Sequence, residues 1–241
     1  MTKALFYFGI TSFWHQGSDT VNVFDILGPV MVGPSSSHTA GAVRIGYVTR
    51  VMLAEEPVRA EICLHGSFAA TGKGHGTDTA IIAGLLGMKP SDMNVPRSFE
   101  IARENGLDFH FENMVVKDAH PNTAVINVEG DGGRSIRIQA SSIGGGRIMV
   151  NRIDGIEVNF TGESNTLIVH NTDMPGNVSR VTSLLAEKKI NIATMQLYRH
   201  EKGGFAVMIL ETDQDVPQEI IEEAQVLEGI IKVTYLQAVA V

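Results

Sequence analysis

The spacing of apolar residues along the chain changes several times, and each change predicts a different structural element. Between residues 42 and 53, the apolar residues Ala42, Ile45, Val48 and Leu53 recur at the spacing of one helix face. A turn-prone stretch of glycine, proline and serine at 33–37 comes before them and predicts the start of that helix. The elements expected next are a strand at 58–64, a glycine-rich loop at 66–76, a helix at 77–86 and a helix from Pro96 to Gly106.

From residue 107 to residue 160 the pattern is one of short strands separated by glycine. Residues 135–140 alternate between apolar and polar types, as a half-buried strand does. The triple glycine 144–146 separates them from a further strand at 147–150. Helices and short strands within one region indicate a mixed α+β domain, which we assign to residues 21–161.

A polar junction at 161–165 precedes a second pattern, which occupies residues 166–241. Strands are expected at 166–170, 191–198, 205–211 and 230–236, and helices at 176–188 and 217–227. The order β-α-β-β-α-β within roughly 75 residues is that of a ferredoxin-like unit. This fold implies no function by itself.

Composition and charge limit the classes of partner. The 241 residues carry a formal net charge of −8, and no stretch collects lysine and arginine, so we expect no nucleic-acid partner. The one cysteine, Cys63, excludes an intrachain disulfide and any cluster held by several cysteines of this chain. The histidines show no zinc-ligand spacing with a third ligand, so no metal site is expected in this chain.

The first twenty residues need a separate interpretation. An apolar run after Lys3 faintly resembles a signal peptide, but no small-residue cleavage pattern follows it. The run is also shorter than the ~20 residues that a membrane-spanning helix needs. We therefore interpret residues 1–20 as a loosely attached extension and expect a cytoplasmic protein with no membrane partner.

The densest polar cluster is the segment 33–41, GPSSSHTAG, which holds His38. Serine at a helix start can cap the helix, and free N–H groups with the helix dipole make that end an anion site that suits a carboxylate. One serine is enough for a cap, so three serines beside a histidine and a threonine favour a ligand site. The candidate ligand-binding residues are Ser35, Ser36, Ser37 and Thr39.

The glycine-rich segment 66–78, GSFAATGKGHGTD, does not match the known phosphate loops. Five residues instead of four separate Gly66 from Gly72, and the dinucleotide spacing is also absent. What remains is a flexible backbone that holds Lys73 and His75 beside a helix start, where Thr77 or Asp78 would be the cap. A histidine at this position can act as a general base, or it can be a surface histidine in a turn.

Three segments, in this order, closely resemble the beta subunit of bacterial iron–sulfur L-serine dehydratase: 28–41, 66–78 and the tetrapeptide HPNT at 120–123. The likeness runs from about residue 23 to the end of the chain, and its first motif is highly specific. The preceding domain is also similar to the allosteric-substrate-binding domain of some phosphoglycerate dehydrogenases. From residue 167 onward, with DMPG at 173–176 and INI at 190–192, the chain looks like an ACT regulatory domain.

The resemblance implies an L-serine ammonia-lyase, which converts L-serine to pyruvate and ammonia without pyridoxal phosphate. The family uses a [4Fe-4S] cluster carried by a cysteine-rich alpha subunit, so this partner would supply the cluster ligands. Its iron would act as Lewis acid on the serine hydroxyl, in a site formed where the two subunits meet. Homodimerisation through the beta or the ACT domain is also expected.

The resemblance also suggests residue roles. His75 is the first candidate for the base that removes the Cα proton, and His38 is the second. The three serines and Thr39 would hold the substrate carboxylate. Lys73 and Thr77 would orient the substrate, and Asp78 would orient His75. The third motif contributes His120, Asn122 and Thr123 as substrate-binding candidates, to which no step is assigned.

Two alternatives stay open. The ACT domain could bind an amino-acid effector near Asn171, Asp173, Asn177 and Asn191, or it could serve dimerisation alone. The whole chain could also be a non-catalytic serine-sensing regulatory protein. An accompanying cysteine-rich partner of about 300 residues would distinguish the enzyme subunit from the sensor.

Overall fold

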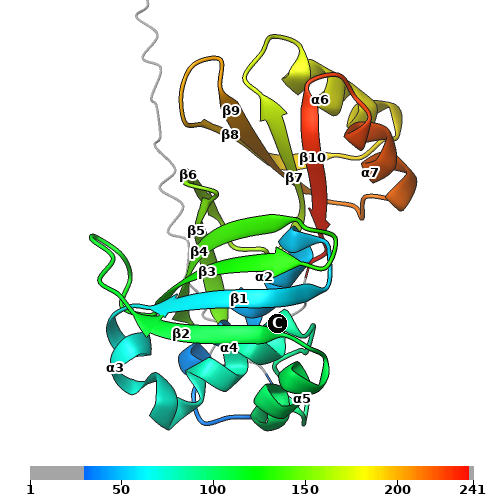
Figure 1. Ribbon diagram of the computed structural model, residues 1–241. Coiled ribbons are helices and arrows are strands. Elements are labelled where there is room, and N and C mark those ends of the chain that lie inside the picture. Colours follow the sequence, from blue (N-terminus) through cyan, green and yellow to red (C-terminus); the bar gives the residue numbers. More distant parts are fainter. Residues whose placement is uncertain (1–29, 239–241) are drawn as a thin grey trace, which may run out of the picture.

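The first part of the chain combines a six-stranded sheet with helices that cover one of its faces (Figure 1). The computed structural model describes residues 30–238. Its strands here are β1 (Pro57–Leu64), β2 (Asp108–Asn113), β3 (Thr123–Gly130), β4 (Ser135–Gly144), β5 (Arg147–Ile153) and β6 (Ile156–Phe160). The helices are η1 (Ser36–Gly41), α2 (Ala42–Leu53), α3 (Gly66–His75), α4 (Thr77–Leu85), η2 (Val95–Arg97) and α5 (Ser98–Glu104).

The strand order is β2-β1-β3-β4-β5-β6, and only β1 and β2 pair in parallel. A parallel pair needs a long crossover, and α3, α4 and α5 provide it. Ile62, Ile126 and Ile138 stand opposite one another in register and are buried. Their neighbours Glu61, Asn127 and Arg137 share the other face. The alternation therefore directs one face to the helices and leaves the other polar.

Helices α2 and α4 lie against each other so closely that only glycine fits at their crossing. A Cβ atom added at Gly46 of α2 would lie 2.1 Å from the carbonyl oxygen of Ile81 in α4. One added at Gly84 of α4 would lie 2.0 Å from the carbonyl oxygen of Val43 in α2. The crossing therefore lies near the start of α2 and near the end of α4.

The predicted loop at 66–76 is wrong, because this segment forms helix α3. The backbone N–H of Ser67 donates to the carbonyl of Pro121 (2.8 Å), which satisfies one of the free N–H groups at the helix start. Phe68 is fully buried and anchors the first turn in the core. The helix ends at Gly76, whose φ of 68° is the left-handed conformation that glycine adopts at a helix end. Tertiary contacts thus outweigh the low helix propensity of the internal glycines.

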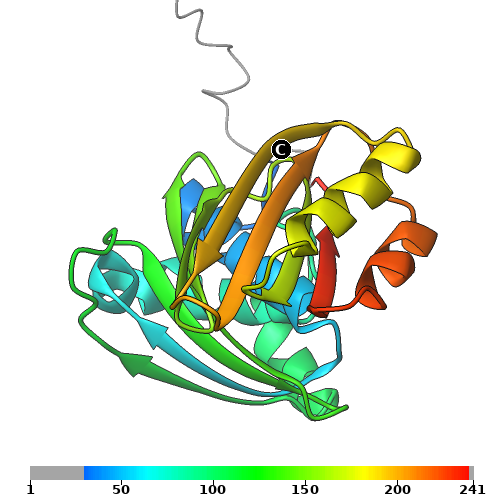
Figure 2. The ribbon, with the colours of Figure 1, turned by 90° about the horizontal axis from the view of Figure 1, so that it is seen from above.

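The second part of the chain has the expected β-α-β-β-α-β order and confirms the ferredoxin-like unit within an α+β protein. Its elements are β7 (Asn165–Thr172), α6 (Asn177–Glu187), β8 (Ile192–Arg199), β9 (Phe205–Thr212), α7 (Gln218–Gln225) and β10 (Ile230–Leu236). The sheet order is β10-β7-β9-β8, and all neighbours are antiparallel. Figure 2 shows α6 and α7 together on one side of this sheet.

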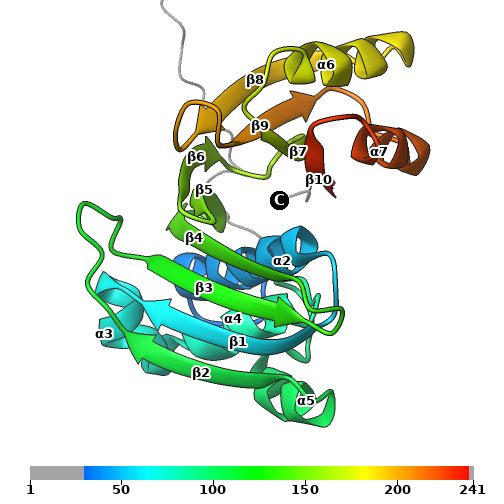
Figure 3. The same cartoon turned by 45° about the horizontal axis from the view of Figure 1, so that its top comes forward.

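In the second sheet, strands β7 and β9 are largely buried on both faces, unlike the strands of many antiparallel sheets. Leu167, Val169 and Met208 form a core with the α6 and α7 side. Ile168 and Val207 point the opposite way and belong to the same apolar core as the first part of the chain. Strand β10 contacts α2, and β6 contacts β8 and β9 (Figure 3). The two parts therefore share a continuous apolar contact.

The prediction about membrane-spanning segments can be compared with the structure only within residues 30–238, and the prediction for the N-terminus falls outside them. Within residues 30–238, no helix is long and apolar enough to cross a bilayer. The extension 1–20 and the apolar segment 21–27 lie outside the described residues. The other predicted helices and strands agree with the observed elements to within a few residues at their ends.

Candidate active site

The site begins at the start of helix α2, where the backbone forms a single π-helical turn, η1. The hydroxyl of Ser35 accepts a hydrogen bond from the backbone N–H of His38 (3.2 Å), so one serine is indeed the cap. Ser36 and Ser37 follow within the first turn and stay partly exposed. Turns of this wider type are rare and often occur at functional sites. Here the turn directs the next two side chains, His38 and Thr39, into the protein.

His38 is held from both sides by hydroxyl groups of other helices. Its Nδ1 lies 3.0 Å from Oγ1 of Thr77 in α4, and its Nε2 lies 3.2 Å from Oγ of Ser67 in α3. The ring is 8% exposed and meets the Phe68 ring edge to face at 5.2 Å between centroids. Burial, and secondly the charge of His75, lower the pKa of His38. The imidazole is therefore neutral at pH 7 and fixed in orientation.

His75 lies beside His38 but faces solvent. It is the last residue of α3, and its ring centroid is 5.0 Å from that of His38. Within the described part of the chain, the His75 side chain has no hydrogen-bond partner, whereas both nitrogens of His38 are engaged. The two candidate bases therefore lie side by side, but His38 is buried and His75 is exposed. His75 is the accessible one.

The third motif, HPNT at 120–123, supports the histidine pair through its backbone. The Pro121 carbonyl receives the Ser67 N–H, so it fixes the residue whose hydroxyl contacts His38. A Cβ atom at Gly66 would lie 2.5 Å from that same carbonyl oxygen, and the φ of Gly66 is +57°, which explains the glycine. Thr123 is fully buried, and its hydroxyl donates to the His120 carbonyl (2.6 Å).

Sequence reasoning missed two residues of this region, Ser67 and Ser142. The backbone N–H of Ser142 in β4 donates to the Asn122 carbonyl (2.9 Å), which ties this strand to the third motif. Its buried hydroxyl has no partner within the described chain, and neither has the hydroxyl of Thr39. A Cβ atom added at Gly41 would lie 2.1 Å from the Ser142 hydroxyl. Ser67 stands inside a recognised motif and could have been found, but nothing in the sequence distinguishes Ser142.

Other expected contacts differ in the structure. Thr77 does not cap α4, because its hydroxyl is directed to His38, and Gly76 occupies the cap position. The Asp78 carboxylate accepts the backbone N–H of Thr79 (2.8 Å), and no hydrogen bond joins it to His75. The side chain of Lys73 lies outside what the structure describes. His120 is exposed, and its Nδ1 accepts the N–H of Asn122 (3.1 Å).

The described residues of this chain do not form a metal or cluster site. No group of three histidine, cysteine, aspartate or glutamate side chains within residues 30–238 is arranged to hold a metal ion. The chain has one cysteine, Cys63, in β1. Burial, with the nearby Glu112 carboxylate, raises the pKa of its thiol, which disfavours a thiolate ligand.

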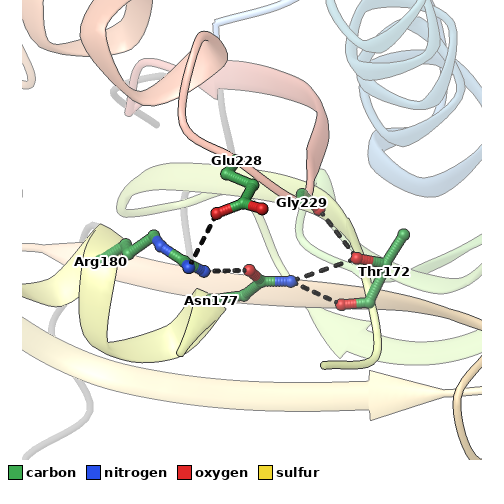
Figure 4. A network of polar contacts seen from close by, with 5 residues as sticks. All are labelled: Thr172, Asn177, Arg180, Glu228 and Gly229. Atoms are coloured by element: carbon green, nitrogen blue, oxygen red, sulfur yellow. Dashed lines mark hydrogen bonds and ion pairs between the residues drawn. The ribbon is translucent and has the colours of Figure 1, made fainter. Parts of the chain in front are cut away.

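Three of the four effector candidates of the ACT domain come together at the loop between β7 and α6, where they bond to the protein itself. Nδ2 atoms of Asn171 and Asn177 both donate to the Thr172 carbonyl, at 2.6 and 2.7 Å. Arg180 donates to Oδ1 of Asn177 and pairs with Glu228 (Figure 4). These bonds hold the loop in place, and they account for both polar atoms of the Asn177 side chain.

Asp173 is the third residue of this group, whereas Asn191, the fourth candidate, lies elsewhere. Asp173 pairs with Arg199 (2.9 Å) and accepts the N–H of Gly203 (3.0 Å), which joins the β7 end to the β8–β9 turn. Asn191 instead bonds to Asp213 and lies at the start of β8. In the β7–β9 pairing, Asn171 is opposite Ala206 and Asn165 is opposite Thr212, next to Asp213. Asn191 therefore lies at the other end of the sheet from the remaining three.

Comparison with known proteins yields two family matches. Residues 22–152 match the family described as the serine dehydratase beta chain, and residues 165–229 match the ACT domain. A probable L-serine dehydratase beta chain from Bacillus subtilis (strain 168) is 41% identical over 213 residues, or 88% of this chain and 96% of the relative. The L-serine dehydratase beta chain from Peptoniphilus asaccharolyticus is 36% identical over 200 residues, or 83% and 90%.

A third relative is a longer chain. L-serine dehydratase 1 from Escherichia coli (strain K12) is 31% identical over an alignment of 120 positions, which covers 39% of this chain and 26% of that protein. The similarity to this relative is therefore confined to part of each chain.

Proposed function

Because the chain belongs to the serine dehydratase beta chain family, we propose that it is the beta subunit of an L-serine dehydratase, with L-serine as substrate. The observation that carries this proposal is the paired environment of His38 and His75 beside the serine-rich start of α2. The names of the two beta-chain relatives support the enzyme subunit over the alternative of a serine sensor.

The serine-rich turn is proposed to bind the substrate carboxylate. Ser36 and Ser37 expose their side chains in the first turn, where backbone N–H groups have no partner within the helix. The turn continues into α2, and no acidic residue occupies its first turn, so the helix dipole favours an anion. Ser35 would act mainly as the cap that shapes this turn. Thr39 and Thr77 would shape the site from inside, since both are buried.

His75 is proposed as the base that removes the Cα proton. Its imidazole is exposed to an incoming substrate, whereas His38 engages both nitrogens with hydroxyl groups. Burial lowers the pKa of His38, so this imidazole is neutral and places no positive charge beside His75. Loss of the proton and of the β-hydroxyl as water leaves aminoacrylate, whose hydrolysis gives pyruvate and ammonia. Lys73 remains a candidate for orienting the substrate. Orientation of His75 by Asp78 has no support in their contacts.

The chain's own residues do not fit an iron–sulfur cluster, since a cluster requires several thiolates and Cys63 is alone. We assign the [4Fe-4S] cluster to a cysteine-rich alpha subunit, and no pyridoxal phosphate to this chain. The longer E. coli relative, of which this chain matches 26%, supports the need for further polypeptide. Docking of that partner over His75 would complete and close the site.

Replacement of His75 in the complex reconstituted with the alpha subunit tests this proposal. His75→Ala should abolish serine-dependent pyruvate formation without loss of assembly, which co-purification measures. His110→Ala is the matched control, because His110 is an exposed histidine on β2 that pairs with Glu112. Near-normal turnover by the His75 variant would remove this residue from the role, and activity of this chain alone would refute the subunit assignment.

For the ACT domain, an amino-acid effector at Asn171, Asp173 and Asn177 stays a prediction, and Asn191 is too far away to belong to it. Calorimetric titration of L-serine and glycine into the full chain tests it, and the absence of heat would favour a role in assembly alone. Homodimerisation through the beta or ACT domain is likewise a prediction. The exposed Met195 and Leu197 on strand β8, which lies at a sheet edge, support it.

A further inference from the structure

A cavity of about 390 Å³ lies between the two sheets, and none of its described lining residues belongs to η1, α3 or α4. Its wall on the first sheet comes from Asp154, Gly155 and Ile156, at the turn between β5 and β6. The second sheet contributes His170, Phe205 and Lys232. The volume is at the lower end of the roughly 300–1,000 Å³ typical of small-molecule sites.

The cavity is formed where the apolar contact between the sheets ends. Along β7, Ile168 packs against the first part of the chain, and His170 points the same way two residues later. Lys232 is opposite His170 in the ladder, and Phe205 lies further along β9. Along this face of the second sheet, the apolar core therefore ends at a cavity that is lined by apolar side chains and a few polar groups.

Two polar side chains of this cavity, His170 and Lys232, have hydrogen-bonding atoms without a partner among the described residues. Neither ring nitrogen of His170 has a partner within the described residues, although both are buried. Both nitrogens are inaccessible, so His170 forms part of the cavity wall without offering a polar atom to a ligand. Lys232 donates to the Met52 carbonyl near the end of α2, and an ammonium has three N–H donors, so two are left over. Burial, and secondly Arg134, lower the pKa of Lys232.

The apolar side chains that line the cavity indicate that its ligand also has an apolar part. Phe205 is 66% exposed and Ile231 is 47% exposed, although both line the cavity. Large apolar side chains next to a concave surface are typical of ligand sites. The one acidic group, Asp154, uses Oδ1 to accept the N–H of Arg137 (2.8 Å).

We propose that this cavity binds a small carboxylic acid with an apolar body, whose carboxylate pairs with Lys232 and whose hydrocarbon part packs on Phe205 and Ile231. The site is distinct from the histidine pair and from the β7–α6 loop. Through Lys232 it is linked to the end of α2, the helix whose start carries the serine-rich turn.

Binding of 4-methylpentanoate to the full chain, measured by isothermal titration calorimetry, tests the proposal. The expected result is saturable binding at one site, with no comparable binding of isoamylamine, which has a similar skeleton and a positive charge. Charge-assisted hydrogen bonds are strong, so Lys232→Met should weaken binding by roughly ten- to hundredfold. Asp154→Asn keeps the acceptor for Arg137 and removes a like charge, so it should tighten binding.

Two further variants separate ligand binding from folding. Lys188→Met changes an exposed lysine that pairs with Glu223 on the far helices, so it should leave binding unchanged. Phe205→Ala alters an exposed side chain, so the variant should fold, yet it should weaken binding several-fold. The proposal is overturned if 4-methylpentanoate does not bind, if isoamylamine binds equally well, or if both Lys232→Met and Phe205→Ala bind like the unaltered chain.

Discussion

The crossing of α2 and α4 makes Gly46→Ala a sharp test of how the site is built. A Cβ atom at Gly46 would lie 2.1 Å from the Ile81 carbonyl oxygen, 2.9 Å from the Leu85 nitrogen and 3.0 Å from the Gly84 Cα. All three neighbours are backbone atoms, so no side-chain rotation can relieve the overlap. Overpacking of a core costs about 1–3 kcal/mol. Because the neighbours are backbone atoms, we expect the upper part of that range, about 2–3 kcal/mol. Alanine regains about 1 kcal/mol of helix propensity, so a net loss of about 1–2 kcal/mol is expected.

The matched control is Gly74→Ala in α3. A Cβ atom there would have no heavy atom within 4 Å, so the substitution should stabilise the chain by about 0.5–1 kcal/mol. Urea denaturation followed by circular dichroism gives the free energy of unfolding of each variant. The two substitutions have the same chemistry and should give opposite signs.

The same perturbation should also reach the active site. The contact between His38 and Thr77 joins the start of α2 to the start of α4 at 3.0 Å, so helices pushed apart should weaken it. Pyruvate formation by the reconstituted complex should fall for Gly46→Ala. If Gly46→Ala unfolded at the same urea concentration as the unaltered chain, the close helix crossing described above would be wrong.

Three further predictions follow from buried polar groups. Thr77→Val should leave His38 Nδ1 without its partner, at a cost of about 1–3 kcal/mol in unfolding free energy and with lower activity in the complex, whereas Thr79→Val should leave activity unchanged. Thr123→Val removes the hydroxyl that contacts His120 and Ser141, and urea denaturation should show a loss of similar size. The pKa of His170 is lowered by burial and secondly by Lys232, so the unfolded chain binds more protons below pH 6.5. Stability should therefore fall as the pH falls from 6.5 through the folded-state pKa, by at most about 1.4 kcal/mol per pH unit for this group. His170→Gln should flatten that slope, and an unchanged slope would contradict the buried neutral state.

Sequence periodicity predicted the elements that bury a clear apolar face. Helix α2 and the six elements of the ACT domain agree with expectation, because spacing of 3.6 or 2 residues determines which side faces a core. Helix α3 could not be predicted in this way. Its glycines argue for a loop, and the contacts that stabilise it come from Pro121 and Phe68, one of which lies over fifty residues away.

In the candidate site, too, the sequence identified some residues, and the roles of others depend on the fold. Motifs identified His38 and His75, but only the fold shows that one is enclosed by hydroxyl groups and the other is accessible. Ser142 is contributed by a strand with no motif of its own, so its position next to Gly41 depends on the packing of β4 against η1. Asn191 was grouped with Asn171 by residue type, although strand geometry separates them by the length of the sheet.

Helix α2 is one of the physical connections between the two halves of the chain, beside the contacts of β6 with β8 and β9. Its start follows the turn that holds His38, and near its end the Met52 carbonyl accepts a hydrogen bond from Lys232 of the ACT domain. Its 12 residues span about 18 Å as one rigid element. The same helix is packed against α4 at Gly46 and Gly84, where the two backbones lie in direct contact. A ligand bound at Lys232 would therefore contact a side chain that bonds to the helix whose start follows the His38 turn, whereas the bonds of Asn171 and Asn177 in the β7–α6 loop stay within the ACT domain.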